Sequence, residues 1–380
     1  MNQVAMKNFY NELELTVVCT TIRNLEPSII IRSNLALDVI DVTSLKFNSR
    51  QTLAAKLERI WQRRTAASIA LYPLSIIYCT VMAFRRLLYR INLFAHYRAP
   101  CPVIVVGNIT VGGNGKTPFT MWLVEWLRSK GCIPGIVLRG YGGDSTVWPQ
   151  KVDMKTSPSM VGDEAVLLAQ RTGAVVVTGP DRGQACKRLL QEGSCDVIIS
   201  DDGLQHLALK RDFEIALHDS TGGIGNGWCL PAGPLREPLS RLEDVDLIVE
   251  YGNPEHGITP LVSGFRSLAS PEQSRMAVDF INRKILFVTG IARPERFMNT
   301  MTGLGINGTL RAFPDHHVYQ PKDLDALGFD AILITEKDAV KLSEFTDKRI
   351  FVAILDLDVA PAIVLELERR LLPLIQHLPH

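Results

Sequence analysis

A glycine-rich stretch in the first third of the chain has the residue types that hold a nucleotide phosphate. The segment NITVGGNGKTP, residues 108–118, follows the apolar run CPVIVVG and precedes the helical pattern FTMWLVEWLRSKG. Backbone N–H groups at a helix start point at an anion, and Lys116 and the Thr117 hydroxyl can reach phosphate and Mg²⁺. The residues predicted to hold a nucleoside triphosphate are Thr110, Val111, Gly112, Gly113, Asn114, Gly115, Lys116 and Thr117.

The stretch departs from the common pattern G-x-x-x-x-G-K-[ST] at one position. Thr110 stands where the first glycine belongs, and the nearest upstream glycine is Gly107. The segment VGGNGKT is close to the variant x-G-G-x-G-K-T instead. A glycine-rich turn that binds nothing is the alternative, but strand, loop and helix follow in the order that the motif requires.

A second apolar run ends in two adjacent carboxylates. In CDVIISDDGLQH, residues 195–206, Asp201 and Asp202 follow a predicted strand, and open α/β sheets bind ligands at the C-terminal ends of their strands. One aspartate there can hold Mg²⁺, directly or through water. A turn or a helix cap is the competing explanation, and the sequence leaves open which of the two contacts a metal.

Other loops carry arginines. RGYGG (residues 139–143) and GNGWCLPAGPLREPLSR (residues 225–241) contain Arg139, Arg236 and Arg241. Glycine-rich loops with arginine suit phosphorylated ligands, although each arginine can equally be a surface cation.

Two further segments hold ionisable groups with ordinary structural explanations. VGDEAVLLAQ begins a helix with Asp163 and Glu164, which are common partners of the helix dipole. FPDHHVY, residues 313–319, offers His316 and His317. A histidine that meets an aspartate across a cleft can orient or tune a general base.

The apolar runs predict the scaffold of these loops. Alternating strands and helices indicate an α/β fold with a mostly parallel sheet and helices on both faces. The predicted strands are 103–107, 133–138, 174–178, 196–200, 213–218 and 245–250, with helices at 118–130, 161–172 and 182–192. After a polar stretch near 252–275, the pattern resumes at 284–290, 330–338 and 349–356, which predicts a second, smaller α/β domain.

One segment is apolar enough to enter a membrane. Residues 65–84 carry no charge, and about 20 such residues cross a bilayer core. Arginines flank it on both sides, so a span and an interfacial helix are both open, and a buried soluble helix is the alternative. The predicted organisation is an extension of unknown role (1–53), a membrane-associated segment (54–95), a nucleotide-binding core domain (96–275) and a C-terminal domain (276–380).

Composition excludes some classes of protein. A net charge of +1 and a pI near 7.6 give no global field for nucleic acid. Seven scattered cysteines without a C-x-x-C pair argue against structural zinc and against a disulfide scaffold, and they suit a cytoplasmic catalytic part.

Seven motifs in order resemble the tetraacyldisaccharide 4′-kinase family: VGNITVGGNGKTP, RGYGG, GDEA, DDGLQH, GNGWCLPAGPLRE, DHH and TEKDAVK. The resemblance runs from about Leu57 to the C-terminus. It implies a P-loop fold with an N-terminal membrane-associated helix at the bacterial inner membrane, facing the cytoplasm. It also implies ATP–Mg²⁺-dependent phosphorylation of the 4′-hydroxyl of a tetraacylated glucosamine disaccharide 1-phosphate to lipid IVA, in lipid A biosynthesis.

The resemblance also implies roles for residues of this chain. Lys116 and Thr117 would contact the triphosphate and the metal, Asp163 would be the general base on the sugar hydroxyl, and His316 its orienting partner. Asp201 and Asp202 would serve catalysis and metal binding. The substrate contacts it implies are Arg139, Gln205 and Arg236.

Two other classes of nucleotide-binding protein have similar motifs. A membrane-recruited regulatory ATPase of the partition or cell-division type has a similar loop, but such ATPases carry a signature lysine where this chain has Val111. TEKD at residues 335–338 resembles a guanine-reading T-K-x-D motif, but Lys337 directly precedes Asp338, which is the wrong spacing.

Deleting residues 1–53 should leave the implied kinase activity intact, because the extension carries no motif. Deleting residues 65–84 as well should release the protein from membranes or slow turnover of lipid presented in bilayers. Membrane fractionation and a lipid phosphorylation assay check both expectations. A folded, membrane-bound truncation of residues 1–53 without activity would contradict the first.

Overall fold

The computed structural model describes residues 29–33, 36–40, 57, 59–113, 115–219 and 223–376. They belong to two units, residues 1–57 and residues 58–380. In the first unit, β1 (Ile29–Ser33) pairs antiparallel with β2 (Ala36–Ile40). The rest of the predicted extension lies outside the described residues.

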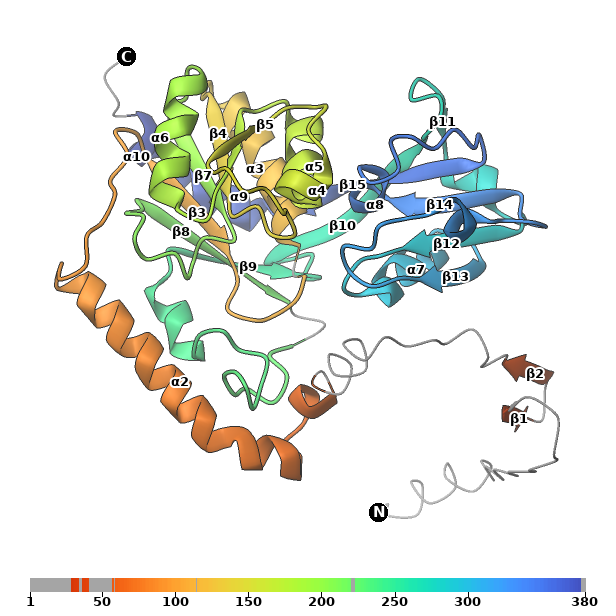
Figure 1. Ribbon diagram of the computed structural model, residues 1–380, viewed down its shortest axis with the longest axis horizontal. Helices are drawn as coiled ribbons and strands as arrows, with labels where there is room; N and C mark the ends of the chain where they lie inside the picture. Colours follow the sequence, from red (N-terminus) through yellow and green to blue (C-terminus); the bar gives the residue numbers. More distant parts are fainter. Residues whose placement is uncertain are drawn as a thin grey trace. The chain divides into compact units, whose positions relative to one another are not determined.

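The second unit is built on one large mixed sheet (Figure 1). Its order, over the residues that the structure describes, is β13-β12-β14-β15-β10-β9-β8-β3-β7-β4-β6-β5, with β11 paired to β10. The strands are β3 (Val103–Gly107), β4 (Pro134–Leu138), β5 (Gln150–Val152), β6 (Val176–Thr178), β7 (Val197–Asp201), β8 (Phe213–Asp219), β9 (Leu247–Tyr251), β10 (Gly257–Ser267), β11 (Ser274–Arg275), β12 (Ile285–Thr289), β13 (Gly308–Ala312), β14 (Ala331–Thr335) and β15 (Ile350–Val359).

Most strand pairs are parallel, which confirms the predicted fold class. The antiparallel exceptions are β5 with β6, and β10 with both β11 and β15. β10 and β15 are long strands that join the two groups of parallel strands, as Figure 1 shows. β10 occupies the polar stretch near 252–275 that the sequence pattern treats as a break. The sequence pattern of β10 does not indicate a strand, because it contains Pro260 and Gly264, and both residue types are uncommon in strand interiors.

The helices of the second unit connect and flank the strands (Figure 1). They are α2 (Ala66–Arg90), α3 (Lys116–Ser129), α4 (Pro158–Val161), α5 (Asp163–Thr172), α6 (Arg182–Glu192), α7 (Pro294–Gly303), α8 (Glu336–Ala339), α9 (Pro361–Arg370) and α10 (Leu372–Gln376). Short 3₁₀ helices span Leu239–Asp244, Ala277–Phe280 and Pro321–Leu324. The predicted helices 118–130, 161–172 and 182–192 correspond to α3, α5 and α6.

α2 is the long apolar helix that the uncharged segment predicts. Its mean hydropathy is 1.7 over the best 18-residue window, of which only 11% is buried. Thr65 caps its start by accepting a hydrogen bond from the Ser68 amide. Two buried polar contacts fix it: Ser75 Oγ donates to the Cys229 carbonyl at 2.7 Å and accepts from the Ala232 amide. An exposed apolar helix, fixed in this way, indicates membrane association.

The C-terminal helix α9 packs on the first group of strands. Ile363 and Leu367 belong to the same buried cluster as Ile104 of β3, Ile199 of β7 and Phe119 of α3. The chain thus returns to its nucleotide-binding half after it has formed β12–β15. The predicted boundary at residues 275/276 remains a prediction.

Replacing Leu367 by alanine should destabilise the protein by about 2–5 kcal/mol, because it empties a fully buried site in the shared cluster. Leu365→Ala on the same helix is the matched control, since that side chain is 63% exposed and should change stability by less than about 0.5 kcal/mol. Denaturant unfolding of both variants measures the difference. Equal losses would contradict the packing described for α9.

Candidate active site

The phosphate loop connects β3 to α3. Gly115 caps α3 with a left-handed φ of 75°, and Lys116 and Thr117 form the first helical turn. A side chain at Gly115 would meet the Tyr251 ring at 2.3 Å, so only glycine fits there. This arrangement matches the predicted strand, loop and helix. Asn114 lies outside the described residues.

The loop that contains Arg236 forms backbone contacts with the phosphate loop. The Val111 amide donates to the Pro234 carbonyl at 2.8 Å, and Thr110 forms a bridge with Leu235. Asn108 Nδ2 donates to the Gly112 carbonyl. Thr110, Val111 and Gly112 are thereby held in place.

Asp202 joins two of the predicted phosphate-binding cations. Its carboxylate lies 3.5 Å from Lys116 Nζ and accepts two hydrogen bonds from Arg236 Nη1, at 3.0 and 3.2 Å. Burial raises the pKa of Asp202, but Lys116 and Arg236 outweigh it, so the net pKa is lowered. Asp202 also has a left-handed φ of 49°, which aspartate adopts more readily than most residues other than glycine.

Asp201 is the buried member of the pair. Its carboxylate accepts hydrogen bonds from the Thr120 hydroxyl (3.2 Å) and the Asp202 amide (3.1 Å). Burial, and then the negative charges of Glu164 and Asp202, raise its pKa to about 7. Arg182, which the sequence analysis missed, donates to the Asp201 carbonyl from a fully enclosed position. The geometry makes Asp202 the more accessible of the two carboxylates.

Asp163 and His316 meet, although 153 positions separate them in the sequence. His316 Nδ1 lies 3.1 Å from the Asp163 carboxylate. Asp163 starts α5 directly after Gly162, which has a φ of 90°. A Cβ added at Gly162 would clash with the Tyr141 carbonyl. His316 has a left-handed φ of 61°, and its ring lies 5.3 Å from the Tyr141 ring, so the RGYGG loop contacts the pair.

Two lysines that the sequence analysis did not assign to the site complete this cluster. Lys337 Nζ and Lys341 Nζ lie 3.9 and 3.8 Å from the Asp163 carboxylate. Burial opposes ionisation of Asp163, but the His316 hydrogen bond and the lysine charges overcome it and lower the pKa. The Asp163 hydrogen bond raises the pKa of His316. Both lysines belong to the TEKDAVK motif. The sequence does not show that this motif packs against α5, so its place in the site could be recognised only from the structure.

Asp338 of the same motif is structural. It is fully buried and accepts hydrogen bonds from Thr289, the Gly290 amide, Tyr319 and Thr335. These bonds join the ends of β12 and β14 to the segment that follows His316. A guanine base has no access to such a carboxylate, consistent with the wrong spacing of TEKD.

The predicted substrate contacts have different environments. Gln205 Nε2 donates to the Asn108 carbonyl and to Glu237, so it braces the phosphate loop. Arg236 is engaged by Asp202. Arg139 follows β4, is exposed, and makes no ion pair with another described residue.

The oxygen atoms present fit Mg²⁺. Asp202 offers a partly exposed carboxylate, and the half-buried Thr117 hydroxyl lies in the first turn of α3. Mg²⁺ prefers a few such oxygen ligands completed by water and phosphate oxygens.

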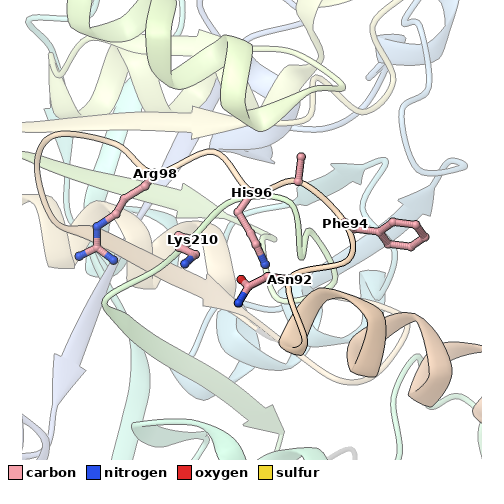
Figure 2. Close-up of a pocket in the computed structure, with 6 residues that line it drawn as sticks. Asn92, Phe94, His96, Arg98 and Lys210 are labelled. Atoms are coloured by element: carbon pink, nitrogen blue, oxygen red, sulfur yellow. The ribbon is translucent and has the colours of Figure 1, made fainter.

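A separate hollow of about 300 Å³ lies beside the C-terminal end of α2 (Figure 2). Its lining residues are Asn92, Phe94, Ala95, His96, Arg98 and Lys210. Asn92, His96 and Lys210 point toward one another, whereas Phe94 points away. None of the predicted site residues lines it.

The sheet is mostly parallel, with a GKT loop at a helix start and an aspartate pair at the end of the adjacent strand. Together with the Asp163–His316 contact, these features define a P-loop phosphotransferase. Residues 67–375 match the tetraacyldisaccharide-1-P 4′-kinase family. The chain belongs to this family, and it is an ATP-dependent kinase of lipid A biosynthesis. The expected fold, family and cofactor ATP are thereby confirmed. The family match excludes the alternative class, a regulatory ATPase of the partition or cell-division type.

Individual relatives agree. The tetraacyldisaccharide 4′-kinase of Methylobacillus flagellatus is 45% identical over 305 residues, covering 78% of this chain and 89% of that protein. The Nitrosococcus oceani kinase of the same name is 44% identical, covering 76% and 86%. A crystal structure of LpxK from Aquifex aeolicus in complex with ATP superposes with a TM-score of 0.69 at 27% identity, covering 81% of this chain and 99% of that one.

Lys116→Ala should lower turnover by at least about 10²-fold, because the charge on the transferring phosphate would lose one of the cations expected to neutralise it. A steady-state kinase assay measures the effect, and Lys284→Gln, at an exposed position before β12, is the control. Retention of most wild-type turnover by the Lys116 variant would contradict the phosphate-loop assignment.

Proposed function

We propose that the chain transfers the γ-phosphate of ATP to the 4′-hydroxyl of a tetraacylated glucosamine disaccharide 1-phosphate, giving lipid IVA. The observation that carries the proposal is the Asp163–His316 contact at the start of α5, a helix that packs against α3. The negative charge of Glu164, which follows Asp163, helps to raise the pKa of Asp201. Asp201 in turn precedes Asp202, which pairs with Lys116. An acid–base unit therefore adjoins the groups that hold phosphate.

Phosphoryl transfer requires mainly positioning and charge neutralisation. Lys116 would contact the β- and γ-phosphates, while Arg236 would face a phosphate of one of the substrates. Mg²⁺ held by Asp202 and Thr117 would neutralise part of the triphosphate charge. The residues around Asp163 would orient the sugar hydroxyl and accept its proton.

The two members of the pair differ in accessibility, which bears on their roles. The Asp163 side chain is 3% exposed, and its oxygens already accept from His316 and from the Glu164 amide. The His316 side chain is 25% exposed. This difference favours His316 as the group that takes the hydroxyl proton through Nε2, with Asp163 holding the imidazole through Nδ1. The alternative is the assignment that the family resemblance implies, with Asp163 as the general base and His316 as its orienting partner.

The proposed site of action is the cytoplasmic face of the bacterial inner membrane. A substrate with four acyl chains stays in the bilayer, so the catalytic groups must reach the headgroup plane. α2 supports this placement, because Tyr78 within it donates a hydrogen bond to the Arg236 carbonyl at 2.8 Å. The apolar helix and the phosphate-facing loop are therefore directly joined.

The dependence of the kinase rate on pH distinguishes His316 from Asp163 as the general base. If His316 is the base, turnover should fall as the pH drops through a pKa above the ordinary histidine value of about 6.5, since the Asp163 hydrogen bond raises it. Asp163→Asn should shift this limb to lower pH and reduce turnover. A limb below about pH 4, where a stabilised aspartate titrates, would instead identify Asp163 as the base.

The pair should also behave as one unit. Asp163→Ala and His316→Ala should each reduce kcat by about 10²–10⁴-fold, and the double variant should lose little more than the more impaired single variant. ATP affinity should survive in all three, because neither residue belongs to the phosphate loop. Additive losses in kcat would assign the two side chains to independent tasks.

A further inference from the structure

Two arginines from the α7 end of the sheet converge on a carboxylate beside the phosphate loop. Asp219 ends β8, and its side chain is completely buried. Arg293 Nη1 lies 2.5 Å from Asp219 Oδ2, and Arg296 Nη2 also pairs with that oxygen. Arg293 caps the start of α7, and Arg296 lies in its first turn. Neither arginine belongs to the site proposed above.

Both side chains extend to the glycines of the loop. Arg296 Nη1 donates to the Gly113 carbonyl at 3.1 Å, and its guanidinium lies 5.2 Å from the centre of the Tyr251 ring, which covers Gly115. A Cβ added to Gly112 would lie 3.7 Å from Arg293 Nη2. The guanidinium of Arg293 therefore lies on the side of Gly112 to which a Cβ would point.

The charges of this cluster do not balance. Two guanidinium groups share one carboxylate, and both are partly withdrawn from water, with 34% and 27% of their side chains exposed. Arg293 Nη2 has no acceptor among the residues that the structure describes. Because a partly desolvated excess cation attracts an anion, and a guanidinium binds phosphate through two parallel N–H groups, the cluster is complementary to a phosphate in the loop.

We propose that Arg293 is a ligand of the nucleotide's phosphate tail and that Arg296 is the positioning residue that connects Asp219 to the phosphate loop. The inference rests on the proposed phosphate-loop site and deepens it. Asp219 fixes the two guanidinium groups, Arg296 holds the Gly113 carbonyl, and Arg293 Nη2, which has no acceptor among the described residues, lies beside Gly112. The second group of strands would thus contribute a cation to ATP binding, as well as His316 to the proposed proton transfer.

The test measures binding of ATP–Mg²⁺ and of tripolyphosphate to the full chain in detergent, by calorimetry without the lipid acceptor. Arg293→Gln should weaken the Kd of both by about tenfold, equal to about 1.4 kcal/mol. Arg293→Lys, which keeps the charge but loses the planar fork, should give an intermediate loss. Arg283→Gln is the matched control at an exposed arginine and should stay within twofold of wild type.

Further measurements separate a phosphate contact from a structural role. The KM for the lipid acceptor should stay within twofold in Arg293→Gln, and the Tm of Arg293→Lys should match that of the control. Weaker ATP binding with unchanged tripolyphosphate binding would overturn the proposal, as would an equal rise in acceptor KM. If Lys116→Ala weakens ATP binding and Arg293→Gln does not, the arginine inference fails alone. If Lys116→Ala has no effect, the phosphate-loop site fails too.

Discussion

The structure depends on compensating one buried negative charge. Asp163 is withdrawn from water at the start of α5, and an isolated carboxylate there would cost several kcal/mol unless it were protonated or paired. Its partners His316, Lys337 and Lys341 all come from the far end of the chain. The nucleotide-binding half of the sheet and the half with β12 and β14 are therefore held in contact where the proposed proton transfer occurs.

The loop between β8 and β9 connects the phosphate loop, Asp202 and α2. It braces Thr110 and Val111 of the phosphate loop, presents Arg236 to Asp202 and accepts two contacts from α2. Glu237 within it is buried and pairs with Arg86 at the end of α2. Removing any one of these contacts would change the loop that all the others share, so effects of mutations in this segment should not be additive.

Much of this arrangement could be predicted from the sequence because it rests on local patterns. Strand, loop and helix around Lys116 and the run that ends in Asp201 are contiguous, and apolar runs marked seven of the described strands with both ends within two residues. β10 was missed because Pro260 and Gly264 interrupt its pattern. Lys337, Lys341, Arg293 and Arg296 were not assigned to the site, since their importance comes from contacts with residues up to 183 positions away. The resemblance linked Asp163 to His316; the spacing alone could not.

The contacts of α2 bear on how this kinase would sample its acceptor. Ser75 and Tyr78 attach the helix rigidly to the loop that holds Arg236, with no flexible tether between them. With α2 in a bilayer, the catalytic groups would stand at one height above the acyl region. The acceptor would then be encountered by lateral diffusion in two dimensions, and the relevant substrate quantity would be its mole fraction among the lipids. Diluting the lipid with inert phospholipid would slow such an enzyme even at constant bulk concentration.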